Sequence, residues 1–480
     1  MKKILSLGPK DWMSGIAQGY HYGSGIWASA TGINPFVDAQ RANTRVGLLQ
    51  AGPAVTDLTA SVIVDTPIGW TADRNVSSNK LFIQGTGTLY SLDLDNDGSL
   101  TALRTVADMA NGIVVFQPNG GTKLLYYWQK TQIGTFDLTS TYDDNGDSYT
   151  GLQSTVHHPT HRLFDVVFYG NKDRIGSLRD NGSGGVTHSL NELDFGSDYT
   201  CTTLSDDGSY LVIGITKNVG GGSLVYPGTK ILFWDTNSSS WEKEWDLDAP
   251  DIISIKKKGE VLYALTSTGL FLFNYSTSPT KVLSLQTGDT AGVSATTGAH
   301  YSMDVQGDGV VWGSASRLHY YGKFVSDSKT SYHQPFSVPN GTATLVCSSA
   351  KHQRIYAGTS TPKFGYYNHS SSGTPDTGVG AESVYIDLLD RYSIQRIDII
   401  YGAKLASGDS VNIGVATPEL TTIADYGGTN ASSFANFGAV SRTKLLGTSL
   451  EAENLLIKPT FVGGVAKIKR IDIYGDKIET

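Results

Sequence analysis

The sequence is poor in charged residues, in methionine and in cysteine, and each shortage limits what the protein can be. Only 17% of its 480 residues are charged, and 4 are methionine. Because the exposed faces of helices are normally built from Glu, Lys and Arg, this composition argues against a helical protein. The two cysteines, Cys201 and Cys347, lie far apart and have no ligand spacing, so neither a disulfide framework nor a zinc site is indicated.

A basic surplus and long apolar segments are also missing. The formal net charge is -8, whereas binding to a phosphate backbone requires an excess of Lys and Arg, so we expect no nucleic-acid partner. The apolar segment 4–7 is too short for a signal peptide, and no run approaches the roughly 18 apolar residues of a membrane span. We therefore expect a protein made in the cytoplasm, without a signal peptide or membrane span.

The abundant residues favour β-structure. The sequence has 55 glycines and 25 tyrosines, together with many Thr, Ser and Val residues. Strands favour β-branched and aromatic side chains, and glycine is typical of the tight turns between short strands. The fold class predicted from composition is therefore all-β.

One pattern recurs seven times along the chain. It consists of a short apolar strand, a turn with Gly, Ser or Thr, and a second apolar or aromatic strand, as in KLFIQGTGTLYSLD from Lys80. Successive copies are 42 to 50 residues apart when anchored on their first apolar residue. The anchors are Leu81, Leu124, Val166, Leu211, Val261, Val310 and Ile355. Since four short strands with their turns need about 40 to 50 residues, the repeat predicts a β-propeller of about seven blades.

One copy of the repeat has a more specific pattern. An Asp/Gly turn at residues 205–210 leads into a strand, and Phe233-Trp234-Asp235 closes a later strand. This copy resembles the WD-repeat and related propeller families. The resemblance implies a fold and leaves the function open, because propellers carry many unrelated activities.

The repeat also predicts how the chain divides. Residues 56–375 are expected to form the propeller, with segment 56–79 supplying an outer strand to the first or last blade. After a polar linker, residues 376–480 are expected to form a small C-terminal β-sandwich. Two segments there nearly repeat and alternate polar with apolar residues, Ile394–Gly402 and Ile468–Gly475, as half-buried antiparallel strands do.

Residues 1–55 do not fit the repeat and are expected to form an extended N-terminal arm. The segment is rich in glycine and aromatic residues but shows neither alternation nor helical spacing. Its aromatic side chains must be buried somewhere, and we favour docking on a neighbouring subunit over packing on the propeller. They are Trp12, Tyr20, Tyr22, Trp27 and Phe36.

The strongest candidate for a ligand site is an acidic loop. Asp93, Asp95 and Asp97, followed by Gly98, match the first ligand positions and the turn glycine of a calcium loop. The ninth and twelfth positions, where further ligands belong, are Thr101 and Arg104. The loop therefore predicts either a weak structural calcium site or a solvated Asp/Gly turn, and we favour the turn.

No pattern in the sequence indicates catalysis. The cluster His157-His158-Pro159-Thr160-His161 lacks a carboxylate at ligand spacing, and its proline forbids a regular helix, so we interpret it as a surface loop. Catalytic serine, zinc-protease and phosphate-binding motifs do not occur. We expect no catalytic residues, no cofactor apart from the calcium named above, and no enzymatic activity.

The order of the parts carries a family resemblance. A Gly/aromatic arm (GYHYGSGIWASATGINPF, then GLLQAGPAVTD) precedes the propeller, and the closing module ends in IKRIDIYGD. This arrangement resembles structural proteins encoded among phage tail and neck genes and, more loosely, the propeller-bearing tail nozzle proteins of short-tailed phages.

The resemblance implies a non-enzymatic structural component of the virion, in the tail or the neck/nozzle region. Its expected partners are other virion proteins and copies of itself, with a host surface glycan as a further partner. It would be made in the host cytoplasm and released by lysis. The alternative is a carbohydrate- or receptor-binding β-propeller, and a glycosidase is the less favoured third choice.

Overall fold

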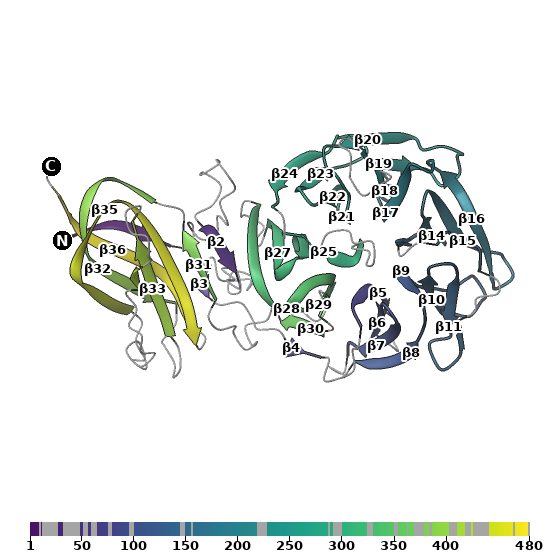
Figure 1. Cartoon of the computed structure of the whole chain (residues 1–480), viewed down its shortest axis with the longest axis horizontal. Helices are drawn as coiled ribbons and strands as arrows, with labels where there is room; N and C mark the ends of the chain where they lie inside the picture. Colours follow the sequence, from purple (N-terminus) through teal and green to yellow (C-terminus); the bar gives the residue numbers. More distant parts are fainter. Residues whose placement is uncertain are drawn as a thin grey trace.

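The structure is a computed structural model of the chain. It describes residues 1–8, 11, 27–31, 49–50, 56–58, 65–74, 79–95, 100–144, 149–154, 157–217, 228–286, 289–290, 300–323, 330–349, 354–361, 363–368, 379–383, 386–402, 410–417, 424–425, 441–463 and 466–478. Antiparallel strands make up most of these residues, which confirms the all-β prediction. They form a ring of sheets with a smaller β-module beside it (Figure 1).

Five four-stranded antiparallel sheets follow one another along the ring. The first is β5 (Pro67–Arg74), β6 (Asn79–Gly85), β7 (Thr88–Asp93) and β8 (Thr101–Thr105); the second is β9 (Met109–Phe116), β10 (Leu124–Gln129), β11 (Ile133–Phe136) and β12 (Tyr142–Asp143). The third is β13 (Thr160–Leu163), β14 (Val166–Asn171), β15 (Arg174–Asp180) and β16 (Val186–Asp194). The fourth is β17 (Tyr199–Asp206), β18 (Leu211–Lys217), β19 (Thr229–Trp234) and β20 (Lys243–Leu247); the fifth is β21 (Ser254–Lys258), β22 (Val261–Leu265), β23 (Gly269–Phe273) and β24 (Thr280–Ser284).

A seven-stranded sheet completes the ring. Its strands, in spatial order, are β25 (Met303–Gln306), β26 (Asp308–Gly313), β27 (Ala315–Lys323), β28 (Ser331–Ser349), β29 (Arg354–Thr359), β30 (Lys363–Asn368) and β4 (Thr56–Asp57). The long strand β28 pairs with β27 through its first part and with β29 from Ala343 onward. β4 comes from the other end of the propeller sequence and pairs with β30, so the start of segment 56–79 supplies an outer strand to the last sheet as predicted. The later part of that segment differs from the prediction, because it forms β5, the inner strand of the first sheet.

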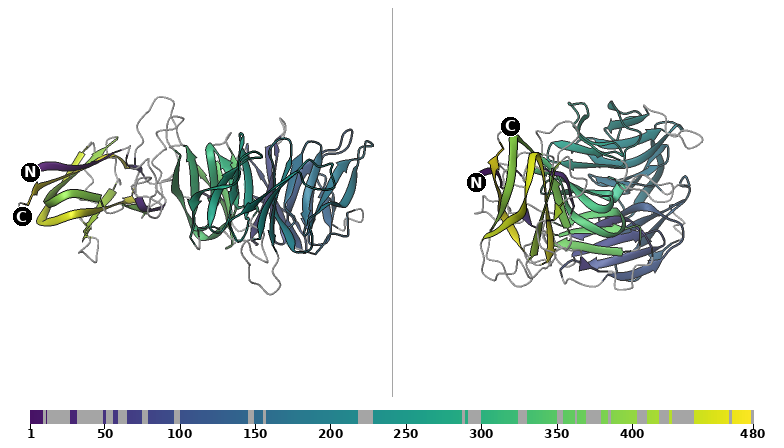
Figure 2. Two further views of the ribbon diagram at one scale, coloured as in Figure 1. Left: turned by 90° about the horizontal axis from the view of Figure 1, so that it is seen from above. Right: turned by 60° about the vertical axis from the view of Figure 1, so that its left-hand side comes forward.

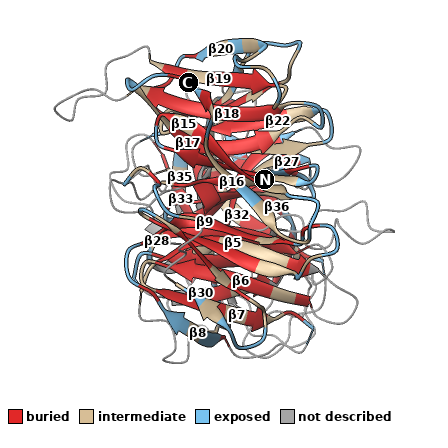
Figure 3. Cartoon of the chain, turned by 90° about the vertical axis from the view of Figure 1, so that its right-hand side faces the viewer, coloured by how far each residue is buried: buried red, intermediate tan, exposed pale blue. Residues whose placement is uncertain are grey.

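The predicted repeat corresponds to the middle hairpin of each unit. Every anchor residue lies in the strand that pairs next to the inner one, and each following strand is its antiparallel neighbour. Second strands such as β6 and β18 are almost entirely buried, whereas the outer strand β8 is mostly exposed (Figure 3). Strand order, burial and sequence pattern therefore agree, because the most apolar strands are those covered by sheets on both sides.

The inner strands close the ring. They are β5, β9, β13, β17, β21, β25 and the second half of β28, and each contacts the next, with β28 returning to β5. At this closure Trp70 Nε1 donates a hydrogen bond of 2.9 Å to the carbonyl oxygen of Val346. A ring of four-stranded antiparallel sheets around one axis is the architecture of a β-propeller. Figure 2 shows it edge-on, with the module at one side.

The second and third sheets each contain the same close contact between a tyrosine and a glycine on adjacent strands. Tyr127 lies opposite Gly134 across β10 and β11, and Tyr169 lies opposite Gly176 across β14 and β15. A Cβ added to Gly134 would lie 2.3 Å from the ring of Tyr127, and one added to Gly176 would lie 2.1 Å from the ring of Tyr169. Glycine is required at these positions because the tyrosine ring occupies the space of a side chain.

The smaller module combines both ends of the chain. From the C-terminal side come β31 (Val379–Ser383), β32 (Ile386–Tyr401), β33 (Ser410–Ala416), β34 (Ala424–Asp425), β35 (Ser441–Gly463) and β36 (Lys467–Lys477). From the N-terminal side come β1 (Lys2–Leu7), β2 (Trp27–Thr31) and β3 (Leu49–Gln50), which pair with β36, β31 and β36. All nine belong to one connected sheet, and both termini lie in this module (Figure 1).

The segment predicted as an N-terminal arm thus differs from the expectation wherever it is described. Its strands complete the C-terminal sheet, and Trp27 is 1% exposed within the apolar core of the chain itself. Of the other aromatic residues proposed for docking, Trp12, Tyr20, Tyr22 and Phe36 lie outside the described residues. The N-terminal strands pair with this sheet because β36 and β31 would otherwise have unpaired edges, and the pairing satisfies their main-chain hydrogen-bonding groups.

Candidate functional site

The acidic loop predicted to hold calcium follows β7. Asp93 ends that strand, Asp95 is exposed in the next turn, and Asp97 lies outside the described residues. The main-chain N–H of Asp95 donates to Asp93 Oδ1 at 2.9 Å, and Asn79 Nδ2 donates to Asp95 Oδ1 at 3.1 Å. Within the part of the chain that is described, no three acidic, His or Cys side chains gather as a metal site. Calcium binding by this loop stays a prediction.

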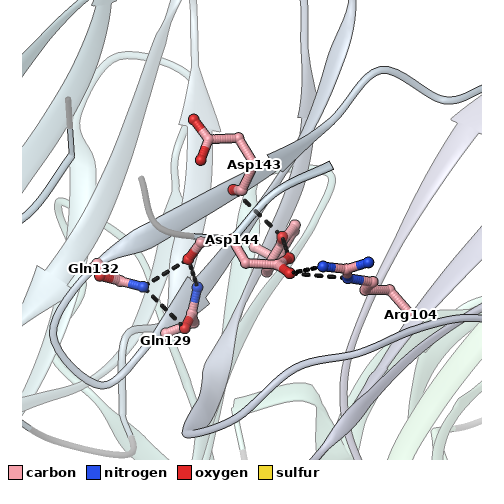
Figure 4. A network of polar contacts seen from close by, with 6 residues as sticks. Arg104, Gln129, Gln132, Asp143 and Asp144 are labelled. Atoms are coloured by element: carbon pink, nitrogen blue, oxygen red, sulfur yellow. Dashed lines mark hydrogen bonds and ion pairs between the residues drawn. The ribbon is translucent and has the colours of Figure 1, made fainter. Parts of the chain in front are cut away.

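Arg104, the residue at the twelfth position of that loop, points to the neighbouring sheet instead (Figure 4). Its Nε and Nη2 donate to Asp144 Oδ2 at 2.8 and 2.5 Å. The hydroxyl of Tyr127 donates to the other oxygen of Asp144, while Gln129 and Gln132 donate to the main-chain oxygen of Asp144 at 2.7 and 2.6 Å. Burial raises the pKa of Tyr127, and the bond to Asp144 raises it further. This network fastens the first sheet to the second.

Polar side chains converge where the inner strands end. Neighbouring inner strands run in the same direction, as β17 and β21 illustrate. Thr202 bonds to Ile252, just before β21 begins, and Asp206, at the end of β17, bonds to Lys257 near the end of β21. The last residues of all the inner strands therefore lie on one face of the ring, which we call the exit face. Several of its side chains carry charge.

The best-connected group on the exit face joins the third, fourth and fifth sheets. His161 Nε2 donates to Asp206 Oδ2 at 2.8 Å, and Lys257 Nζ lies 3.3 Å from Asp206 Oδ1. The hydrogen bond from His161 lowers the pKa of Asp206; burial opposes this shift, and the charges of His161 and Lys257 support it. Asp206 is therefore a carboxylate, and all three side chains are about a quarter exposed.

The axis of the ring is occupied by the chain itself. The short 3-10 turn η1 (His300–Ser302) contacts β5, β17, β21 and β28. Thr203 Oγ1 lies 2.7 Å from His300 Nδ1, and Ser254 Oγ donates to the carbonyl oxygen of His300 at 2.6 Å. Burial lowers the pKa of His300 well below its usual value, and the charge of Lys256 lowers it further. His300 is thus a neutral side chain that cross-links inner strands.

A second polar group lies beside this turn. Lys256 Nζ lies 5.7 Å from the centre of the Tyr301 ring, and burial lowers its pKa against the opposing charge of Asp304. The main-chain N–H of Ser348 donates to Asp304 Oδ2 at 2.7 Å, and Ser348 Oγ donates to Gln306. The two bonds of Ser348 join β28 to β25, and Lys256 of the fifth sheet lies beside the same turn, so this group also has a structural role.

The histidine cluster is not a surface loop, and that prediction was wrong. His158 is fully buried: its Nδ1 lies 2.7 Å from the oxygen of Gly170 and its main-chain N–H donates to Asn111 at 2.9 Å. Burial lowers its pKa, which the main-chain hydrogen bonds oppose. His161 lies in the exit-face group described above. β13 begins at Thr160, so His158 lies before the strand and His161 lies within it, and the two side chains have different surroundings.

An open pocket of about 660 Å³ lies on the exit face of the first three sheets. It is lined by Ala72, Asp73, Val115, Phe116, Gln117, Pro118, Asn119, Gly120, Lys123, Arg162, Asp165 and Asp180. Lys123 Nζ bonds to Asp73 at 2.9 Å, and Arg162 lies over the ring of Phe116, 5.3 Å from its centre. Sequence reasoning missed this pocket, because its residues are spread over more than 100 positions, from Ala72 to Asp180, and meet only across sheets.

Comparison with known proteins gives no family. No family model matches the chain, and no curated protein matches it. Among solved structures, the computationally designed Ika8 protein is 13% identical over 66% of this chain and all of its own, with a TM-score of 0.39. Virginiamycin B lyase from Staphylococcus aureus is 13% identical over 65% of this chain and 98% of its own, with a TM-score of 0.43.

The WD40 domain of Pan2 from Neurospora crassa is 8% identical over 68% of this chain and 98% of its own, with a TM-score of 0.46. Similarity at this level carries no argument about this protein. The class of the protein, an all-β chain with a propeller ring, therefore rests on its own strand pairing. Among the described residues, no helix has the length and apolar character needed to cross a bilayer.

Proposed function

We propose that this chain is a non-enzymatic structural component of a phage particle, in the tail or the neck/nozzle region, that docks to neighbouring virion subunits. The ring is then a seven-bladed propeller, in which the two parts of β28 belong to separate blades. The C-terminal module is a β-sandwich: β35 pairs with β32 through its first part and with β33 and β31 after residue 455, so it crosses between two layers.

The observation that carries this proposal is the pairing of the two chain ends in one sheet. β1 and β36 are antiparallel neighbours from Lys2 opposite Gly475 to Leu7 opposite Ile471. A subunit that must survive outside the cell is open to unfolding and proteolysis from its termini. Pairing both chain ends within one module protects the subunit against unfolding and against proteolysis. The polar side chains near the propeller axis bond to one another between neighbouring blades, and such bonds suit a structural role.

The module also offers a docking residue. Leu389 is 87% exposed and has a φ of 66°, a conformation that costs a residue other than glycine roughly 1 kcal/mol. Strained backbone positions recur at functional sites, and an apolar side chain can anchor a protein–protein contact. We assign Leu389 to the surface that meets a neighbouring virion subunit.

The test is incorporation into particles. Mass spectrometry of purified particles from a phage that encodes the chain should find it in a fixed ratio to the other virion proteins. In complementation, Leu389→Gly should lower its incorporation, whereas Phe164→Gly, which removes another exposed apolar residue at a positive φ, should not. Absence from particles would overturn the proposal and favour a free carbohydrate- or receptor-binding propeller.

A further inference from the structure

The turn between β13 and β14, whose Asp165 lines the exit-face pocket, has an unusual residue at Phe164. Leu163 and Val166 are partners across this hairpin, so Phe164 and Asp165 form a two-residue turn. Phe164 has a φ of 55° and is 66% exposed. Glycine or asparagine normally occupies such a position, since a side chain there is strained. The sequence thus presents an aromatic ring to solvent at a conformational cost.

Two residues close to Phe164 in the chain, one on either side of it, line the pocket. Arg162 and Asp165 both line it, and Arg162 Nε donates to the main-chain oxygen of Phe164 at 3.1 Å. The guanidinium of Arg162 lies over the ring of Phe116. This contact limits the directions in which the N–H groups of Arg162 can point. Arg162 and Asp165 are 3.5 Å apart. That separation is long for an ion pair, so both groups can still bond to a ligand.

The charges of the pocket are nearly balanced. The cations Lys123 and Arg162 face the carboxylates of Asp73, Asp165 and Asp180. Asp73 is bonded to Lys123, and Asp180 Oδ2 accepts the main-chain N–H of Asn119 at 2.8 Å. A strongly charged ligand would meet repulsion from one set or the other. Donors and acceptors placed side by side suit a neutral ligand whose groups both donate and accept hydrogen bonds.

We propose that this pocket binds a neutral saccharide, with Phe164 at its rim stacking on one face of a sugar ring. Vicinal hydroxyls match the alternating carboxylate, guanidinium and amide groups, and the C–H face of a pyranose matches an exposed aromatic ring. The volume of about 660 Å³ is within the usual range for small-ligand sites. This site is independent of the docking surface at Leu389.

The experiment is isothermal titration of the full chain with neutral tri- and tetrasaccharides and with sialylated counterparts. Neutral saccharides should bind, and Phe164→Gly should weaken binding roughly two- to tenfold, the range expected for loss of one aromatic contact. Because glycine accepts the φ of 55°, Phe164→Gly should melt no lower than the unchanged protein. Loss of binding without loss of stability separates a ligand contact from a structural role.

Two variants in the other module serve as matched controls. Leu389→Gly removes an exposed apolar residue with a φ of 66°, and Arg391→Ala breaks an exposed pair with Glu451 at 2.8 Å. Both should leave binding unchanged, whereas Arg162→Ala should weaken it. The proposal is overturned if no neutral saccharide binds, if sialylated ones bind more tightly, or if Phe164→Gly binds like the unchanged protein.

Discussion

Ser6 donates a hydrogen bond of 2.6 Å to Asp472, a residue 466 positions later in the chain. Asp472 is 1% exposed and is also held by Arg470 Nε at 2.9 Å and by Lys3 Nζ at 3.9 Å. A buried carboxylate of this kind is stable only while its partners are in place. The N-terminal strand is therefore needed for the C-terminal module, in addition to covering the edge of β36.

Deleting residues 1–8 should selectively destabilise the C-terminal module. The deletion removes β1, leaves Asp472 without Ser6 and Lys3, and opens the edge of β36. We expect calorimetry to show a lower melting temperature for the module, while the transition of the propeller stays in place. Ser6→Ala should give a smaller loss, about 1 kcal/mol for one hydrogen bond. A module that melts unchanged after the deletion would contradict this role of β1.

Gly176→Ala should destabilise the third sheet through the ring of Tyr169. The new Cβ would lie 2.1 Å from Cζ of that ring, whose hydroxyl lies 2.7 Å from His188 Nε2. Displacing the ring should cost about 1 to 3 kcal/mol, as overpacking usually does. Urea unfolding measures the loss. In a Tyr169→Ala background the same substitution should be nearly neutral; equal losses in both backgrounds would rule out the clash.

The sequence predicted the fold well where paired strands lie close together along the chain. The hairpins anchored at Leu81 and Leu124 could be predicted because both strands of each lie within one short segment. The pair Tyr169 and Gly176 could also have been found, since Tyr127 and Gly134 have the same separation in the preceding repeat. Local apolar patterns and turn residues determine structure at this range.

Features assembled from distant segments could not be predicted. Nothing in the first residues of the chain shows that Lys2 pairs with Gly475, because a single strand does not reveal its partner. Burial of His158 depends on Asn111 and Gly170 in neighbouring strands, so its segment alone looked like a loop. The pocket beside Phe164 is likewise built across three sheets.

Trp70→Phe should weaken the closure of the ring. The change removes the hydrogen bond from Trp70 Nε1 to the oxygen of Val346 and keeps an aromatic ring near Tyr301, whose centre is 6.5 Å away. Leaving a main-chain oxygen unpaired should cost about 1 to 3 kcal/mol. Trp241→Phe is the control, because its bond to Glu244 is exposed and lies within one sheet. Equal losses in the two variants by urea unfolding would argue against a special role of this contact.

His319 should make the stability of the protein depend on pH. Its ring is stacked on Trp312 and is bonded to Ser314 and Tyr332 at 2.7 and 2.6 Å. Burial lowers its pKa to about 3, with a smaller effect from the charge of Arg317. The unfolded chain takes up this proton near pH 6.5 and the folded chain does not. The folded state therefore loses stability as the pH falls from about 6.5 to about 3, by up to about 1.4 kcal/mol per unit.

His319→Phe is the variant that tests this dependence, because it keeps a ring in the stack and removes the titrating group. It should be less stable at pH 7.5 by about 1 to 3 kcal/mol, since Ser314 and Tyr332 each lose a hydrogen bond. Its stability should then fall less steeply between pH 6.5 and 5 than that of the unchanged protein. His158 and His300 shift in the same direction, so some dependence remains. Parallel curves for the two proteins, or an imidazole signal of His319 that titrates near pH 6.5, would show that this ring is not held neutral by burial.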